Sequence, residues 1–288
     1  MTGMLELPRP VALVLSGGSS LGSIQAGMLL ALVEAGIVPD FIVGTSVGAL
    51  NGAYMAADWS RDRVDALGDI WLGIRAGDVF PRLGLVRALR MLGAGNALVS
   101  PSALQALIDR CLPAAHAALT IPTSVVATAL DSGHSVVLDK GDLRRNVLAS
   151  AAIPGVFPAV EVDGTFLVDG GVSAQVPLLP ARALGARTVV VLDVGVPCAL
   201  KVTPTGVVAP ILRVLQVALH HQTTAALDLL AAECVVLYLP SPCPLSVAPY
   251  DFSQTAALMH VGHTGAAHFL AGVQVDGSGI YGHPHRHD

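Results

Sequence analysis

The chain has 288 residues, of which 53% are hydrophobic and 13% charged, and its formal net charge is −5. This length is sufficient for one large α/β domain with a substantial core. The negative net charge gives no reason to expect a nucleic-acid partner. The four cysteines contain no C-x-x-C pair, so we expect reduced thiols and a cytoplasmic protein.

The uncharged run over residues 11–33 is long enough to suggest a membrane-spanning helix. The Ser16-Gly-Gly-Ser-Ser20 segment in its middle would place unpaired polar backbone in lipid, so we reject that interpretation. No basic and then apolar leader opens the chain, so we do not expect secretion by that route.

The first half of this run predicts a buried strand over Val11–Leu15, followed by a glycine-rich loop over Ser16–Gly22. A helical pattern follows over Ser23–Ala35, and Gly36 is a typical C-terminal stop. Phe41–Val43 is the next apolar run. Strand, helix and strand together form a βαβ unit, which predicts parallel neighbouring strands and a right-handed crossover.

The pentapeptide Gly44-Thr-Ser-Val-Gly48 follows this second strand directly and precedes a helix rich in small residues. A G-x-S-x-G motif between a strand and a helix is typical of a nucleophile elbow. The two glycines are needed because the backbone at Ser46 turns sharply against the neighbouring chain. The βαβ geometry brings Ser46 and the glycine loop to the same edge of the sheet.

The segment over 71–100 has no regular pattern and carries several arginines among leucines. A surface helix with arginines lying along apolar surface explains this composition. The alternative is a basic amphipathic flap over residues 75–92 that contacts an anionic lipid surface. The arginines concerned are Arg75, Arg82, Arg87 and Arg90.

The remainder of the chain alternates strand and helix patterns without a linker or an internal repeat. We expect a single domain over residues 1–276 and a disordered tail over residues 277–288. The expected strands are Val125–Leu130, Ser135–Asp139, Val160–Val162, Thr165–Val168, Thr188–Val194 and Cys234–Leu239. The expected helices are Ser102–Cys111, Leu143–Ser150, Ile211–Leu230 and Thr255–Ala271.

A serine hydroxyl needs a base to accept its proton and donors to stabilise the oxyanion that it creates. Asp169 ends a predicted strand and is followed by two glycines, so its carboxylate is a candidate base. The Gly17-Gly-Ser19 segment opens a helix and can turn backbone N–H groups toward one point. The same loop could instead bind phosphate.

Four blocks of this sequence resemble the patatin-like phospholipase family of acyl hydrolases, in the same order and with similar spacing over residues 11–180. The resemblance implies an α/β three-layer sandwich with a mostly parallel central sheet and the elbow after the second strand. The blocks are Ser16–Gly22, Gly44–Gly48, Ala149–Pro158, and Asp169–Gly171 with Pro177 shortly after it.

The resemblance also implies a Ser–Asp dyad, with Ser46 as the nucleophile and Asp169 as the general base. It assigns the oxyanion hole to Gly17, Gly18 and Ser19, and it implies no metal and no cofactor. The expected reaction is hydrolysis of carboxylic ester bonds in phospholipids or lysophospholipids through an acyl-serine intermediate.

Three positions depart from the family pattern. Ser19 stands where the family usually has a third glycine, and Leu21 where it has a basic residue; Gln175 replaces the usual Asn. A positive φ at Ser19 would cost about 1 kcal/mol of strain, and a charge near the oxyanion is missing. A catalytically weak lipid- or nucleotide-binding module is therefore one alternative.

A classical Ser–Asp–His esterase is the other alternative, because a histidine is the usual base after a G-x-S-x-G serine. His260, His263 and His268 follow Asp169 in the required order. The histidines in the tail, His283, His285 and His287, are not expected to hold a metal.

Overall fold

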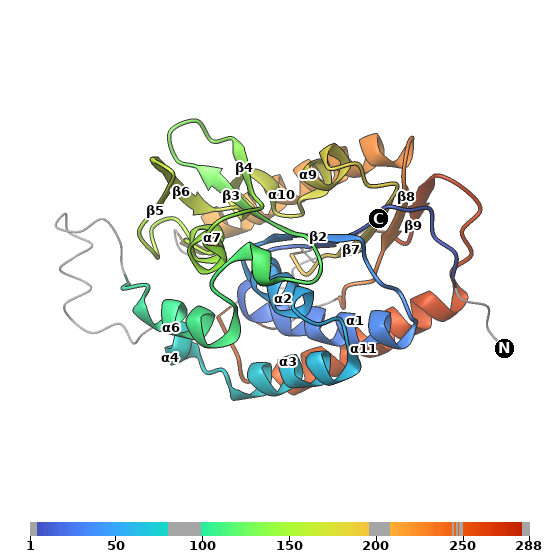
Figure 1. Cartoon of the computed structure of the whole chain (residues 1–288), viewed down its shortest axis with the longest axis horizontal. Coiled ribbons are helices and arrows are strands. Elements are labelled where there is room, and N and C mark those ends of the chain that lie inside the picture. Colours follow the sequence, from blue (N-terminus) through green and yellow to red (C-terminus); the bar gives the residue numbers. More distant parts are fainter. Residues whose placement is uncertain are drawn as a thin grey trace.

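The molecule is built around one nine-stranded sheet (Figure 1). The computed structural model describes residues 5–79, 99–195, 208–243, 245, 247 and 250–283. The strands are β1 (Val11–Leu15), β2 (Phe41–Thr45), β3 (Thr123–Ala129), β4 (Ser135–Leu138), β5 (Val160–Val162), β6 (Thr165–Asp169), β7 (Thr188–Leu192), β8 (Val235–Tyr238) and β9 (Gly279–Tyr281).

The strand order is β5-β6-β3-β2-β1-β7-β8-β9, and β4 pairs with β3 outside this path. The strands from β3 to β9 in this order are parallel to one another. β4, β5 and β6 join the sheet through antiparallel pairs. The expected mostly parallel sheet is therefore confirmed, including the parallel pairing of β1 and β2 across the first helix.

Helices cover both faces of the sheet and produce three layers (Figure 1). One face carries α9 (Leu178–Ala183) and α10 (Val208–Ala231). The other carries α1 (Gly22–Glu34), α2 (Val47–Ala56), α3 (Arg61–Gly73) and α11 (Thr255–Gly272). The shorter helices are α4 (Ala76–Val79), α6 (Ser102–Cys111), α7 (Leu143–Ser150) and α8 (Gly171–Ala174). This arrangement confirms the expected three-layer α/β sandwich.

The central strand β1 shows why two helical layers are needed. Leu13 and Leu15 pack into the core beneath α1 and α2, whereas Ala12 and Val14 pack into the core beneath α9 and α10. Successive side chains of a strand point to opposite faces. Every residue of β1 is buried, as expected of a parallel strand covered on both sides.

The turns follow the local sequence signals. Gly36 has φ +70° just after α1 and ends that helix in the left-handed conformation. Asp163 and Gly164 both have positive φ and join β5 to β6 in a tight hairpin.

Three expectations need correction. Residues 279–281 form β9, which pairs with β8, so the tail from Gly277 is ordered at this point. Residues 71–73 belong to α3, where no regular pattern was expected. Cys243 takes part in a disulfide bond, whereas Cys111 and Cys234 are free. The expectation of a cytoplasmic protein, which rested on reduced thiols, loses that support.

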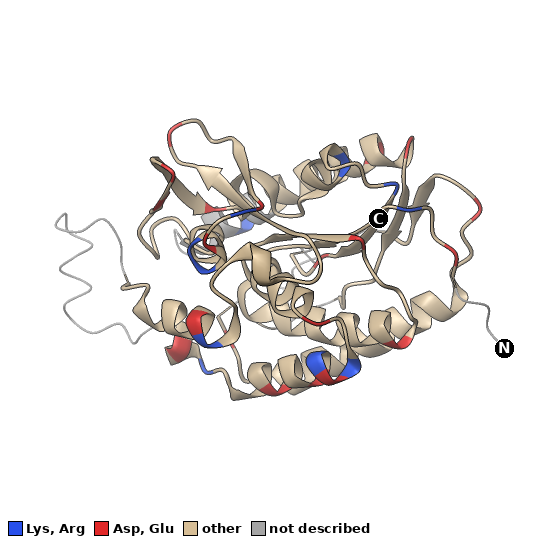
Figure 2. Ribbon diagram, in the orientation of Figure 1, with Lys and Arg blue, Asp and Glu red and all other residues tan. Residues whose placement is uncertain are grey.

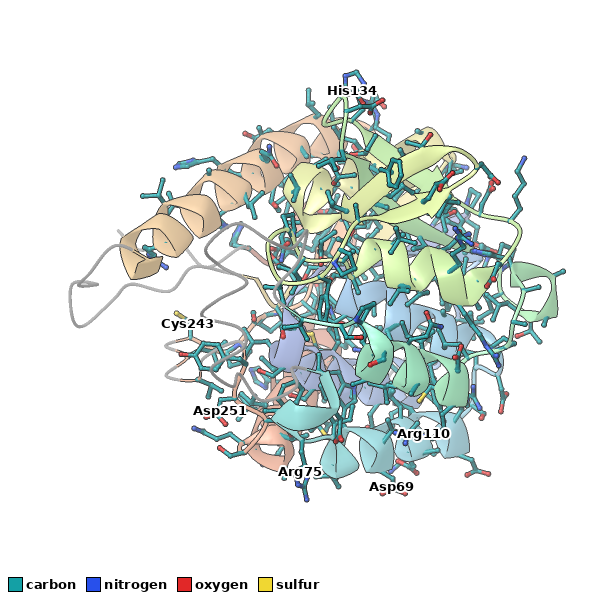
Figure 3. All side chains as sticks on the ribbon, turned by 90° about the vertical axis from the view of Figure 1, so that its left-hand side faces the viewer. Asp69, Arg75, Arg110, His134, Cys243 and Asp251 are labelled. Carbon is teal, nitrogen blue, oxygen red and sulfur yellow. The ribbon has the colours of Figure 1, made fainter. Side chains whose placement is uncertain are left out.

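The proposed basic flap over residues 75–92 lies mostly outside the described residues. Of its arginines, Arg75 is described and lies at the outer edge of the molecule (Figure 3). Its guanidinium donates to the carbonyl oxygen of Leu72 at 2.8 Å and so caps the end of α3. Within the described residues, no helix is long and apolar enough to cross a membrane.

The helices α1 and α11 cross in close contact because glycines stand at the crossing. A Cβ atom on Gly27 would collide with the backbone carbonyl of Met259, and one on Gly262 with the carbonyl of Ile24. Backbone atoms in a packed crossing cannot move aside as a flexible side chain does.

We expect Gly27→Ala to lower the free energy of unfolding by about 2 kcal/mol, as overpacking in a core does. Gly73→Ala is the matched control, because a Cβ atom there meets nothing within 4 Å and alanine favours the helix. Urea denaturation of both variants measures the difference. Equal stability of the two variants would contradict the close crossing.

Candidate active site

The backbone turns sharply at Ser46, between the end of β2 and the start of α2. Ser46 has φ 54° and ψ −122°, a sparsely populated backbone conformation that costs a non-glycine residue on the order of 1–3 kcal/mol. A Cβ atom on Gly48 would collide with the carbonyl of Leu15, and one on Gly44 with the backbone of α2 at Ala49. The two glycines therefore permit the strained turn that the pentapeptide predicts.

The turn brings Ser46 to Asp169, which lies 123 positions later at the end of β6. Ser46 Oγ donates a hydrogen bond of 2.7 Å to Asp169 Oδ2, and both residues are buried. The other carboxylate oxygen, Oδ1, accepts a 2.7 Å hydrogen bond from the backbone N–H of Gly171. The bond from Gly171 thus fixes the orientation of the carboxylate, and its other oxygen accepts from the serine hydroxyl.

Burial changes the acidity of this carboxyl group. Loss of solvation raises the pKa of Asp169 from 3.8 to about 6, although the bonds from Ser46 and Gly171 oppose the shift. A carboxylate with a pKa near neutrality is a stronger proton acceptor than an ordinary aspartate. Asp169 therefore combines the position and the basicity that a general base needs.

The glycine loop lies beside this pair and opens into a 3-10 turn over Ser19–Leu21. Ser19 has φ 53°, so this serine takes the left-handed conformation expected of the glycine it replaces. Gly18, Ser19 and Ser46 line the same cavity. Among the described residues, the backbone N–H groups of Gly18 and Ser19 have no acceptor.

Gly17 differs from its two neighbours. Its backbone N–H donates to the carbonyl of Gln175 at 3.0 Å, and its own carbonyl accepts from Gln175 Nε2 at 2.8 Å. A donor committed to a backbone carbonyl is not available to an oxyanion. The expectation that Gly17 supplies a donor is therefore wrong; Gly17 and Gln175 instead hold the loop in place.

A buried polar chain supports the loop from the opposite side. Gln25 Nε2 donates to the carbonyl oxygens of Ser16 and Leu192 at 2.9 and 3.1 Å. Asn51 donates to Gln25 Oε1, and Trp71 Nε1 donates to Asn51 Oδ1, each at 3.0 Å. Fully bonded buried networks fix one arrangement of the groups they join. The sequence analysis did not predict this network, although a Gln and an Asn among apolar helical residues indicate buried side chains that need hydrogen-bond partners.

Two cavities meet at Ser46, and both are also lined by Ser19 and Ile153. The first is apolar and runs beneath α2, α3 and α6, with side chains that include Leu50, Trp71, Ile74, Leu104, Leu107 and Phe157. The second is more polar and is lined by Asp169, Gln175, Asp193, His220 and Thr223 among others. The hydroxyl of Ser46 thus stands at the junction of an apolar and a polar space.

The late histidines lie elsewhere. His260 and His268 lie on α11 away from both cavities, and His263 Nε2 bonds Glu34 Oε2 at 2.6 Å on α1. No histidine of the described residues is hydrogen-bonded to Ser46 or Asp169. The described part of the chain therefore does not provide the imidazole that a Ser–Asp–His triad requires.

Positions with charged residues lie mainly in the helices and loops, and the helix α3 carries residues of both signs (Figure 2). In the part of the chain that is described, no group of three His, Cys, Asp or Glu side chains is arranged to hold a metal ion.

More than half of the chain matches a known protein family. Residues 13–182 match the family model described as patatin-like phospholipase. The chain is 33% identical over 187 residues to "Patatin-like phospholipase domain-containing protein 7" of Rattus norvegicus, a match that covers 64% of this chain and 14% of that protein. It is 34% identical over 184 residues to an NTE family protein of Mycobacterium tuberculosis, with coverage of 61% and 46%.

The chain therefore matches less than half of the length of either relative. Among solved structures, VipD from Legionella pneumophila aligns with a TM-score of 0.45 and 13% identity, over 91% of this chain and 67% of that one. The family match confirms the resemblance that the four sequence blocks indicate.

Proposed function

Because the chain belongs to the patatin-like phospholipase family, we propose that it hydrolyses carboxylic ester bonds of lipids through an acyl–Ser46 intermediate. The observation that carries this proposal is the 2.7 Å hydrogen bond from Ser46 Oγ to the buried carboxylate of Asp169. The carboxylate is the one side chain bonded to this hydroxyl among the described residues.

In the proposed mechanism, Asp169 Oδ2 accepts the proton of Ser46 as Oγ attacks the ester carbonyl carbon. Asp169 then gives the proton to the departing alkoxide, and the acyl group remains on Ser46. In the second half, Asp169 takes a proton from water, which attacks the acyl group, and returns it to Ser46 as the acid leaves. Ser46 and Asp169 are thus restored after each turnover.

The tetrahedral intermediates carry an oxyanion that needs donors. The unbonded N–H groups of Gly18 and Ser19 line the cavity at Ser46, so they are the donors we assign. Ser46 also stands at the N-terminal end of the ten-residue helix α2, where the helix dipole favours negative charge. Leu21 supplies no charge here, so these backbone dipoles provide the electrostatic stabilisation.

The apolar cavity supports an acyl chain as the part of the substrate that enters beneath α2 and α6. Its walls are leucine, isoleucine and aromatic side chains from several elements. Burial of a hydrocarbon chain there is favourable by about 0.8 kcal/mol per CH₂ group. The apolar walls of this cavity are a physical reason to expect esters of apolar acids rather than of polar ones.

The test is the rate at which a fluorophosphonate probe labels Ser46 between pH 5 and 8. The probe reacts with an activated serine, so the rate depends on the ionised form of Asp169. Because the pKa of Asp169 is raised to about 6, the carboxyl is protonated below this pH and cannot accept a proton. We expect the rate to be constant above about pH 7 and to fall about tenfold per pH unit well below pH 6.

Mass spectrometry of the labelled protein identifies the modified residue. Labelling at Ser46 with this pH dependence supports the dyad. No labelling at Ser46 would favour a catalytically weak module that binds lipid, and a rate independent of pH from 5 to 7 would exclude Asp169 as the base.

A further inference from the structure

The polar cavity extends away from Ser46 toward the helix α10. Leu219, His220 and Thr223 of this helix line its wall. Residues three and four apart lie on the same face of a helix, so His220 and Thr223 face the same space next to Leu219. None of these residues belongs to the dyad or to the glycine loop.

His220 is the side chain of this wall that is free to bind a ligand. Thr223 Oγ1 already donates to the carbonyl of Leu219 at 3.2 Å, and Gln175 Nε2 donates to the carbonyl of Gly17. By contrast, the imidazole of His220 has no hydrogen-bond partner among the described residues. A half-buried ring with two unused nitrogens lines the cavity that holds Ser46.

The nearby carboxylate of Asp193 forms its hydrogen bonds with other groups and not with this imidazole. Asp193 is buried, and its oxygens accept hydrogen bonds from Tyr238 Oη and, at 2.8 Å, from the N–H of Gly195. Burial lowers the pKa of His220, although the charge of Asp193 opposes the shift. The ring is therefore uncharged at neutral pH, and binds through hydrogen bonds.

We propose that His220 binds the alcohol part of the ester substrate by a hydrogen bond to an oxygen of a glycerol-type leaving group. This inference rests on the proposed function. If the acyl chain occupies the apolar cavity, the ester lies at Ser46, where the two cavities meet. The alcohol part then extends into the polar cavity. The oxygen of the alcohol part that His220 binds is either a free hydroxyl or a phosphate oxygen, and both can accept a hydrogen bond from the imidazole N–H.

The experiment compares three substrates that carry the same acyl chain: a 1-monoacylglycerol, a lysophosphatidylcholine and a p-nitrophenyl ester. The aryl ester lacks the glycerol oxygens. For His220→Ala, we expect the ratio of kcat/KM for the glycerol esters to that for the aryl ester to fall about tenfold, the effect of one lost hydrogen bond. A similar loss with both glycerol esters, or a larger loss with monoacylglycerol, indicates a hydroxyl, because lysophosphatidylcholine also carries a free glycerol hydroxyl. A larger loss with lysophosphatidylcholine indicates a phosphate oxygen.

His221→Ala is the matched control, because this neighbouring histidine is exposed and does not line the cavity. The ratio of kcat/KM for the glycerol esters to that for the aryl ester should be the same in this variant as in the wild type. His220→Asn, which keeps a donor, should recover part of the loss. If the alanine variant does not fold, the comparison of His220→Asn with His220→Phe decides, since phenylalanine fills the space without a hydrogen-bonding atom.

The inference is overturned if both glycerol esters keep the wild-type ratio in the His220 variants. An equal loss for all three substrates also overturns it, because the effect would then not depend on the alcohol part. Failure of the proposed function is a different result. In that case the wild type hydrolyses none of the three esters, or Ser46→Ala hydrolyses them as fast.

Discussion

Replacing Ser46 with Ala is expected to lower kcat/KM for a long-chain ester by at least about 10⁴-fold, because the acyl–enzyme intermediate can no longer form. The remaining oxyanion donors and the apolar cavity still bind substrate, so KM should change much less than kcat. Hydrolysis of a p-nitrophenyl ester with a long acyl chain, followed at pH 8, measures both constants. At this pH Asp169 is ionised, so its protonation does not limit the rate.

Ser135→Ala is the matched control for this substitution. Ser135 is exposed on β4, and neither of the two cavities at Ser46 includes it. This variant should retain the wild-type rate, and circular dichroism should show that both variants are folded. A Ser46→Ala protein that is folded and keeps more than a tenth of the activity would overturn the acyl-serine mechanism.

Replacing Asp169 with Asn is expected to lower kcat about 10³-fold, within the range that general-base catalysis contributes. The amide can still accept from the Gly171 N–H at the position of Oδ1, so the loop after β6 should keep its place. It cannot take the proton of Ser46. The variant should also lose the step near pH 6 in the fluorophosphonate labelling rate, because the titrating group is gone.

The effect of this substitution on stability separates a catalytic from a structural role. The folded pKa of Asp169 is above its ordinary value, so the ionised group opposes folding at neutral pH and this penalty disappears as pH falls below about 4. The amide that replaces the carboxylate carries no charge, so the melting temperature of Asp169→Asn at pH 7.5 should be equal to or above that of the wild type.

Asp163→Asn is the matched control for Asp169→Asn. Asp163 lies at the exposed β5–β6 turn with φ 48°, a conformation that asparagine tolerates well. We expect wild-type activity in this variant. A fall in activity equal to that of Asp169→Asn, or an Asp169→Asn protein that unfolds, would contradict the assigned role of the carboxylate.

The local sequence was sufficient for most elements and for the turn at Ser46. Val11–Leu15, Ser102–Cys111 and Leu143–Ser150 have in the structure the bounds that their apolar patterns predict. Such patterns are readable because burial imposes a period of 2 on half-buried strands and of 3.6 on helices, and a continuous apolar run on strands covered on both faces.

Elements without a strong pattern were missed for the same reason. β9 has three partly exposed residues and forms because β8 offers it an open edge. The disulfide bond of Cys243 was also not foreseen, because a cysteine pairing depends on the distance between the two Cα atoms in the folded chain.

For the site, the sequence by itself determined the residue types: a serine held between glycines, an aspartate at a strand end and a glycine loop before a helix. The tertiary structure alone decided which of their groups are available. In the folded chain, the N–H of Gly17 donates to the carbonyl of Gln175, and Asn51 donates to Gln25 behind the loop. His220 lines the wall of the polar cavity. Hydrogen-bond partners and solvation depend on chain segments that meet only after folding, whereas a turn or a strand depends mainly on its own residues.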